Sequence, residues 1–190
     1  MKQVPIGVSA RHIHLSAEHL EALFGSSYDL RKLKDLSQPG QFAAVETVRV
    51  EGPKGFYDHV RILGPVRSQT QLEISMSDSK ALGLECPVRQ SGDLEGSPGF
   101  KLIGPSGELE VKEGAIVAAR HIHFNTKEAE QWGIRNQQLL RVRVNGKRPL
   151  IFEEVMAKVS DRYALDMHID TDEANAAGIE GVCSGEILDW

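Results

Sequence analysis

Apolar and polar residues alternate along several short stretches of the chain, a pattern typical of β-strands with one buried face. The clearest alternating stretches span residues 47–51, 60–63, 71–75, 108–111 and 140–144. Turn signals rich in glycine, proline or asparagine separate them, at residues 52–55, 64–65, 104–107 and 145–146. The pattern therefore predicts a mainly β (α+β) fold made of short strands, as in small barrels or sandwiches.

Short helical segments interrupt the predicted strands. We expect helices within residues 16–25, 78–83, 125–133 and 171–178, and each of these segments ends at a glycine. Ser16 and either Asn125 or Thr126 are suitable N-caps, because their side chains accept hydrogen bonds from the first turn of a helix. Glycine readily adopts the left-handed backbone that ends many helices.

One segment of the chain occurs twice. Val-Ser-Ala-Arg-His-Ile-His-Leu at residues 8–15 recurs as Val-Ala-Ala-Arg-His-Ile-His-Phe at residues 117–124. The copies lie more than half a chain apart, so they indicate two related halves rather than a solenoid repeat. We expect two β-barrel domains, residues 1–90 and residues 91–190, between which segments can be exchanged.

The repeated segment carries two pairs of histidines, His12 with His14 and His121 with His123. Alternate residues of a strand point to the same side, so each pair shares one face. Two imidazoles at this spacing can bind one metal ion at about 2.0–2.1 Å. The alternative interpretation is that the four are ordinary core or surface histidines.

A site with two histidines is incomplete, because catalytic zinc usually has three protein ligands and an open position. His168, in an alternating segment between two aspartates, is one candidate for a further ligand. Glu73 is a second candidate. An ordinary strand histidine and a solvated carboxylate are the respective alternatives.

Composition narrows the functional classes. The net charge of −5 gives no general attraction to nucleic acid or to an anionic membrane, so an anionic ligand needs a local basic pocket. Arg67, in a hydroxyl-rich loop, can bind phosphate with its planar guanidinium group, although an exposed loop charge is the alternative. The two cysteines form no Cys-x-x-Cys motif, and no signal peptide or membrane-spanning run is present, so we expect a cytoplasmic protein.

With these residues assembled, the chain resembles the phosphate propanoyltransferase family, the propanediol-utilisation type of phosphotransacylase. The resemblance covers nearly the whole chain. It rests on residues 8–15, 36–43, 62–65, 67, 69–71, 73–75, 91–93, 96–97, 118–123 and 167–175.

The resemblance implies two β-barrel domains with a dinuclear zinc site between them. It implies that His12, His14 and Glu73 hold one zinc ion, and that His121, His123 and His168 hold the second. Arg67 would be the catalytic, phosphate-binding residue. The implied contacts to coenzyme A are Ser9, Arg11, Lys34, Lys54, Arg61 and Asn175. A homodimer is also expected. Family members packaged in bacterial microcompartments have an N-terminal targeting extension, which is not visible here because the motif begins at Val8.

The implied reaction converts a short-chain acyl-CoA, either propanoyl-CoA or acetyl-CoA, and phosphate to acyl phosphate and CoA, reversibly. A dinuclear metallohydrolase and a non-catalytic module stabilised by metal are the alternatives that the motifs leave open. Iron, cobalt and nickel also suit imidazole ligands, so the motifs do not fix the metal.

Overall fold

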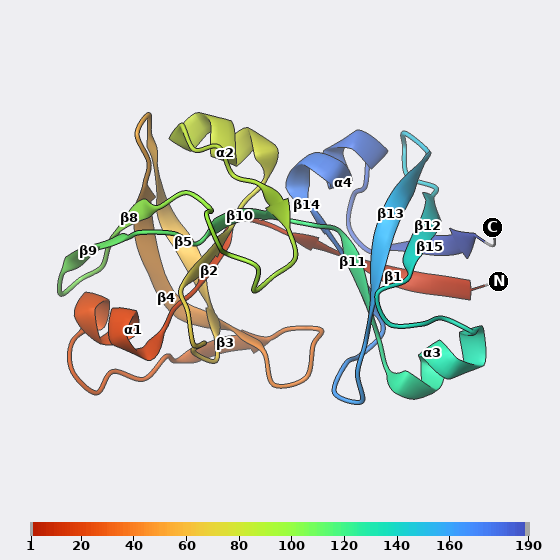
Figure 1. Cartoon of the computed structure of the whole chain (residues 1–190), viewed down its shortest axis with the longest axis horizontal. Helices are drawn as coiled ribbons and strands as arrows, with labels where there is room; N and C mark the ends of the chain where they lie inside the picture. The colour runs from red at the N-terminus through yellow and green to blue at the C-terminus, as the bar shows by residue number, and fades with distance from the viewer. Residues whose placement is uncertain (1, 189–190) are drawn as a thin grey trace. The chain divides into compact units, whose positions relative to one another are not determined.

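The structure, a computed structural model, describes residues 2–188, and within them the fold is mainly β with four short helices (Figure 1). The helices are α1 (Ala17–Phe24), α2 (Met76–Leu82), α3 (Thr126–Trp132) and α4 (Thr171–Ala177). None of these described helices has the length and apolar character that crossing a bilayer requires. The predicted helices are confirmed, but α2 begins earlier than expected. The Ser75 side chain accepts a hydrogen bond from the Asp78 N–H and caps this helix, so the preceding strand ends at Glu73.

The described chain divides into two compact units, and each has its own apolar core. Residues 2–9, 37–39 and 119–188 form one unit, which we call the barrel unit. Residues 10–36 and 40–118 form the other, which we call the sheet unit. The division into domains at about residue 90 stays a prediction.

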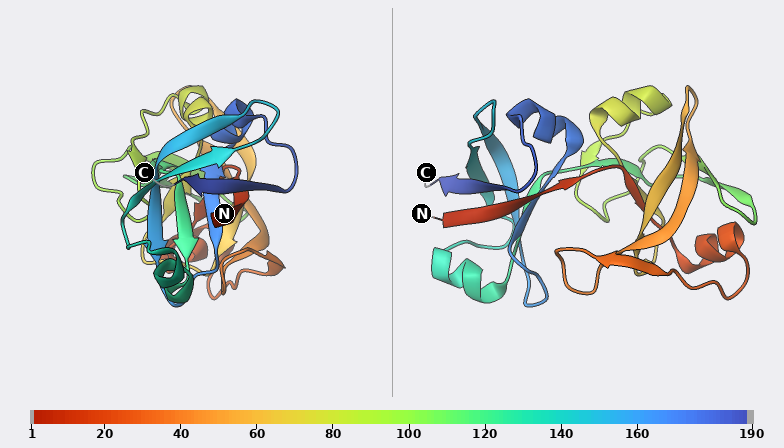
Figure 2. Two further views of the ribbon diagram at one scale, coloured as in Figure 1. Left: turned by 90° about the vertical axis from the view of Figure 1, so that its right-hand side faces the viewer. Right: turned by 180° about the vertical axis from the view of Figure 1, so that it is seen from behind.

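In the barrel unit, six strands close into a barrel in the order β1-β14-β11-β13-β12-β15. Their bounds are β1 (Lys2–Ser9), β11 (His121–Phe124), β12 (Leu139–Val144), β13 (Leu150–Val159), β14 (Asp166–Asp170) and β15 (Cys183–Leu188). Strand β1 pairs in parallel with β14 and antiparallel with β15, and Figure 2 shows β1 and β15 side by side. The first strand of the sequence therefore completes a barrel made from the second half.

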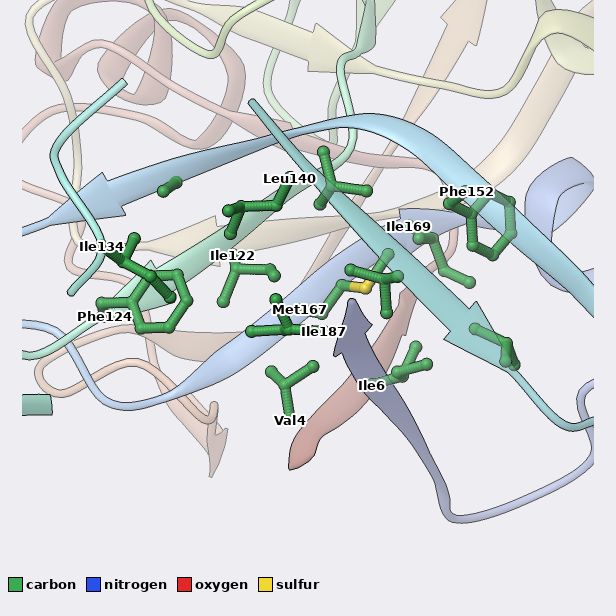
Figure 3. Packing of buried hydrophobic residues seen from close by; sticks show 14 of the residues in the cluster. Val4, Ile6, Ile122, Phe124, Ile134, Leu140, Phe152, Met167, Ile169 and Ile187 are labelled. Carbon is green, nitrogen blue, oxygen red and sulfur yellow. The ribbon is translucent and has the colours of Figure 1, made fainter. Parts of the chain in front are cut away.

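Alternate residues of the barrel strands fill its interior (Figure 3). Ile122 and Phe124 of β11 are fully buried there, as is Met167 of β14. Because successive side chains of a strand point to opposite faces, the residues between them face outward from the barrel. His121, His123 and His168 therefore lie on the outer face.

The sheet unit contains a curled sheet in the order β7-β10-β6-β2-β5-β4-β8-β9, with β3 paired to β4. The strands are β2 (His12–His14), β3 (Lys32–Asp35), β4 (Phe42–Glu51), β5 (Phe56–Gly64), β6 (Gln71–Glu73), β7 (Val88–Arg89), β8 (Phe100–Ile103), β9 (Glu108–Val111) and β10 (Ala115–Ala118). Ile13 and Leu72 are fully buried in its core. The expected architecture of two barrel-like parts with short helices is thereby confirmed.

Candidate metal centres

The first group of metal-binding side chains comes from the short antiparallel pair β2 and β6. In this register His12 lies opposite Glu73, and His14 lies opposite Gln71. The central residue of β2, Ile13, points into the core, so the flanking histidines point to the other face. The potential ligand atoms of His12, His14 and Glu73 all lie within 4.8 Å of one another. One metal ion can therefore contact all three after small side-chain movements.

Backbone carbonyl groups orient both imidazoles of this group. His12 Nδ1 lies 2.9 Å from the Ala10 carbonyl oxygen, and His14 Nδ1 lies 3.2 Å from that of Leu63. A carbonyl oxygen only accepts, so Nδ1 carries a proton in each ring and Nε2 is the nitrogen available to a metal. The Nε2 atoms of His12 and His14 lie 3.4 and 3.9 Å from the Glu73 carboxylate oxygens. The rings thus present their ligand atoms beside the carboxylate.

Burial and charge favour the metal-binding forms of His14 and Glu73, but not that of His12. Burial, together with the positive charge of Arg67, lowers the pKa of the His14 imidazole to about 3. Burial opposes ionisation of Glu73, but His12, His14 and Arg67 outweigh it and lower the pKa of this carboxyl group. Burial likewise opposes the charged form of His12, and Glu73 raises the pKa of this imidazole above its usual value. A neutral imidazole and an ionised carboxylate are metal ligands. Binding of a cation would displace the proton from a charged His12 imidazole.

The second group repeats this arrangement in the barrel unit. Strands β11 and β14 are antiparallel, His121 lies opposite His168, and His123 lies opposite Asp166. Ile122 and Met167 occupy the inward-facing pair, as Ile13 and Leu72 do in the first group. The potential ligand atoms of the three histidines again lie within 4.8 Å of one another. The two groups are therefore equivalent in register, with Glu73 and His168 in corresponding places.

The surroundings of the second group also resemble those of the first. His121 Nδ1 lies 2.8 Å from the Ala119 carbonyl oxygen, which repeats the contact between His12 and Ala10. His168 Nε2 lies 3.0 Å from Asp166 Oδ2 and 3.4 Å from Ser37 Oγ. A carboxylate that accepts from one ring nitrogen orients the imidazole and leaves the other nitrogen for a metal. The Tyr163 ring, 4.5 Å from that of His123, lines the same group.

The sequence predicted no role for two residues that support Glu73. The buried Gln71 donates from Nε2 to Glu73 and to Ser91 Oγ, and its Oε1 accepts from the Gly92 N–H at 2.7 Å. Ser91 donates from its hydroxyl group to Glu73 Oε1 at 3.2 Å. The sequence did contain one signal for Gln71. It precedes Glu73 by two residues in an alternating stretch, so the two side chains share a face of the strand.

Arg67 lies beside the first group. Its Nη1 donates to Ser91 Oγ at 3.1 Å, and its charge lowers the pKa values of His14 and Glu73. The backbone N–H of Arg67 donates to the Leu15 carbonyl oxygen at 2.9 Å, which fixes the loop to the end of β2. Ser91 therefore connects this guanidinium group with the carboxylate ligand.

The six residues predicted to contact coenzyme A are divided between the units. Ser9 and Asn175 belong to the barrel unit, while Arg11, Lys34, Lys54 and Arg61 belong to the sheet unit. Lys34 and Lys54 are exposed, on β3 and in the turn between β4 and β5. Arg61 donates to the carbonyl oxygens of Ala44 and Val45. The proposed contacts with coenzyme A stay predictions.

The donor sets of both groups fit zinc, which binds imidazole nitrogen and carboxylate oxygen and, in catalytic sites, has three protein ligands. Fold and site together define a β-barrel protein with two candidate three-ligand metal centres among its described residues.

Comparisons with known proteins agree with this class. The model of the phosphate propanoyltransferase family matches residues 5–180. A phosphate propanoyltransferase of Thermotoga maritima is 54% identical over 173 residues, covering 90% of this chain and 82% of the relative. One of Enterococcus faecalis is 49% identical over 183 residues, covering 96% of this chain and 87% of the relative. The chain belongs to the phosphate propanoyltransferase family, a family of acyltransferases.

Proposed function

We propose that this protein transfers a short-chain acyl group, propanoyl or acetyl, between coenzyme A and inorganic phosphate, in both directions. The observation that carries the proposal is the pair of equivalent ligand groups in a chain of this family, with Arg67 beside the first group. Both substrates are anionic, whereas the chain has a net charge of −5. Local cations are therefore needed to bring the substrates together.

The proposal assigns one zinc ion to each group, as the predicted dinuclear site requires. His12, His14 and Glu73 would hold one ion, and His121, His123 and His168 would hold the other. Zinc bound there would supply positive charge that stabilises the developing oxyanion and the departing thiolate. A cytoplasmic location and a homodimer stay predictions.

The residues around the first group would position the phosphate. The planar guanidinium of Arg67 can bind two phosphate oxygens, and Ser91 holds it in a fixed relation to Glu73. A phosphate oxygen would attack the thioester carbonyl carbon, the carbon–sulfur bond would break, and coenzyme A would leave as a thiolate. Holding both reactants in the reactive orientation can contribute as much as about 7–11 kcal/mol.

An assay of thiol release from propanoyl-CoA and acetyl-CoA, with and without phosphate, tests this function. We expect release to depend on phosphate and an acyl phosphate to accumulate in step with free thiol. Metal analysis of the same preparation should give two equivalents of zinc per chain. Thiol release at the same rate without phosphate would identify a hydrolase and contradict the proposal.

Direct transfer requires no nucleophilic side chain, and the two cysteines provide a test. Cys86 and Cys183 are free thiols that pack against the apolar cores of the sheet unit and the barrel unit. Burial raises the pKa of the Cys86 thiol, which disfavours the nucleophilic thiolate. We expect the double variant Cys86→Ala/Cys183→Ala to keep turnover within about threefold of the wild type, because neither thiol has a chemical role. A folded double variant that loses about 100-fold or more would contradict direct transfer.

A further inference from the structure

The arginine in each copy of the repeated motif forms an ion pair with a helix. Arg11 donates from Nη2 to Asp78 Oδ1 at 2.7 Å and from Nε to Asp78 Oδ2 at 3.1 Å. Arg120 donates from Nη1 to Glu173 Oε1 at 2.9 Å. Each arginine directly precedes the first histidine of its group. The two ion pairs therefore repeat along with the ligands.

The two carboxylates occupy corresponding places in the fold. Asp78 follows Glu73 at the same sequence spacing at which Glu173 follows His168. Each carboxylate lies in the first turn of a seven-residue helix, and its backbone N–H donates to the N-cap side chain. Each ion pair thus connects the residue directly before the histidine strand with the helix that follows the third ligand.

The strands alone give little rigidity to these positions. β2 and β6 have three residues each, so few ladder hydrogen bonds fix His12 relative to Glu73. Asp78 is only 4% exposed, and the Arg11 guanidinium that faces it also lies 4.1 Å from the Tyr57 ring. A buried carboxylate depends on such a partner, since water cannot replace it.

We propose that the pairs Arg11–Asp78 and Arg120–Glu173 are positioning devices, each of which holds the two histidines and the third ligand of its own group in metal-binding geometry. The inference rests on the proposed function, because it assigns metal to both groups. Arg11 was also predicted to contact coenzyme A. A change at Asp78 leaves that arginine in place and so separates the two roles.

The test measures metal binding in backgrounds that retain a single group. Asp78→Asn is combined with His121→Asn, so that only the first group can bind added metal. Glu173→Gln is combined with His12→Asn, so that only the second group can bind it. The probe is Co²⁺, whose visible absorption reports ligand geometry. Each change should weaken Co²⁺ binding about 10–100-fold at its own group, as changes to outer-shell partners do, and should alter the spectrum.

The matched control is Glu46→Gln. Glu46 is a buried carboxylate of the sheet unit that pairs with Arg31 at 2.8 Å, on β4 rather than on a ligand strand. The Glu46→Gln change should alter the stability of the protein but leave its Co²⁺ affinity and the absorption spectrum of bound Co²⁺ unaltered. Arg11→Lys, which keeps the charge and loses the planar fork, should give an intermediate affinity at the first group.

Wild-type affinity and spectrum in the folded Asp78→Asn and Glu173→Gln proteins would overturn the positioning role while leaving the proposed function intact. If Asp78→Asn fails to fold, the Co²⁺ affinity and spectrum of Glu173→Gln and Arg11→Lys test the positioning role instead. A wild-type protein that binds no metal would overturn the proposed function and this inference with it.

Discussion

Replacing His12 or His121 with asparagine is expected to remove one equivalent of metal and to lower turnover about a thousandfold. A cation acting as a Lewis acid supplies several kcal/mol, and about 1.36 kcal/mol corresponds to a factor of ten in rate. Asparagine is chosen because its amide N–H can still donate to the carbonyl oxygen that Nδ1 now contacts, in Ala10 or Ala119. The change therefore removes the metal-binding Nε2 and keeps a donor near the position of Nδ1. Turnover and metal content measured on the same sample check the prediction.

The control for this prediction is His59→Asn. His59 is exposed and adopts a left-handed backbone (φ 57°), which asparagine tolerates well. This variant should retain both equivalents of metal and wild-type turnover. Full metal content together with full activity in either ligand variant would show that the corresponding group is not a metal centre of this enzyme.

Replacing Arg67 with alanine is expected to lower kcat/KM for phosphate about 10–100-fold, because a hydrogen bond to a charged group contributes about 1.5–3 kcal/mol. The KM for the acyl-CoA should change little. Arg67→Lys should recover part of the loss, since it restores the charge but not the planar pair of donors. Steady-state kinetics with each substrate varied in turn distinguish these effects.

Two checks accompany the Arg67 variants. Arg135→Ala, which removes an exposed arginine of the barrel unit, should behave as the wild type in both kinetic series. Metal content should also be measured in Arg67→Ala, because Ser91 links this arginine to Glu73. Wild-type phosphate kinetics in the alanine variant would remove Arg67 from the phosphate site.

Local sequence patterns predicted most of the secondary structure because the signals act over a few residues. Asn125 and Gly133 bound α3 by side-chain capping and a left-handed glycine, and both features can be recognised in the sequence. The stretch 71–75 shows where this reasoning is limited. Alternation favours a strand through Ser75, but the Ser75 hydroxyl caps α2, and the cap determines where the strand ends.

Strand partners were not predictable in the same way. Nothing in residues 2–9 indicates that β1 pairs in parallel with β14 and antiparallel with β15. Such pairing joins opposite ends of the sequence, and its stability comes from the shared core around Val4, Ile6 and Met167. A pattern read within a few residues carries no information on partners so far away.

The sequence by itself determined that two histidines share a face in each repeated motif, because the period of a strand is two residues. It also determined the short helix that follows each motif. The pattern of the motifs left the third side chain of each pair open, and the tertiary structure shows which one joins it, since this depends on the register between strands distant in sequence. That register sets His12 opposite Glu73 and His121 opposite His168, and it brings Asp78 and Glu173 to the arginines.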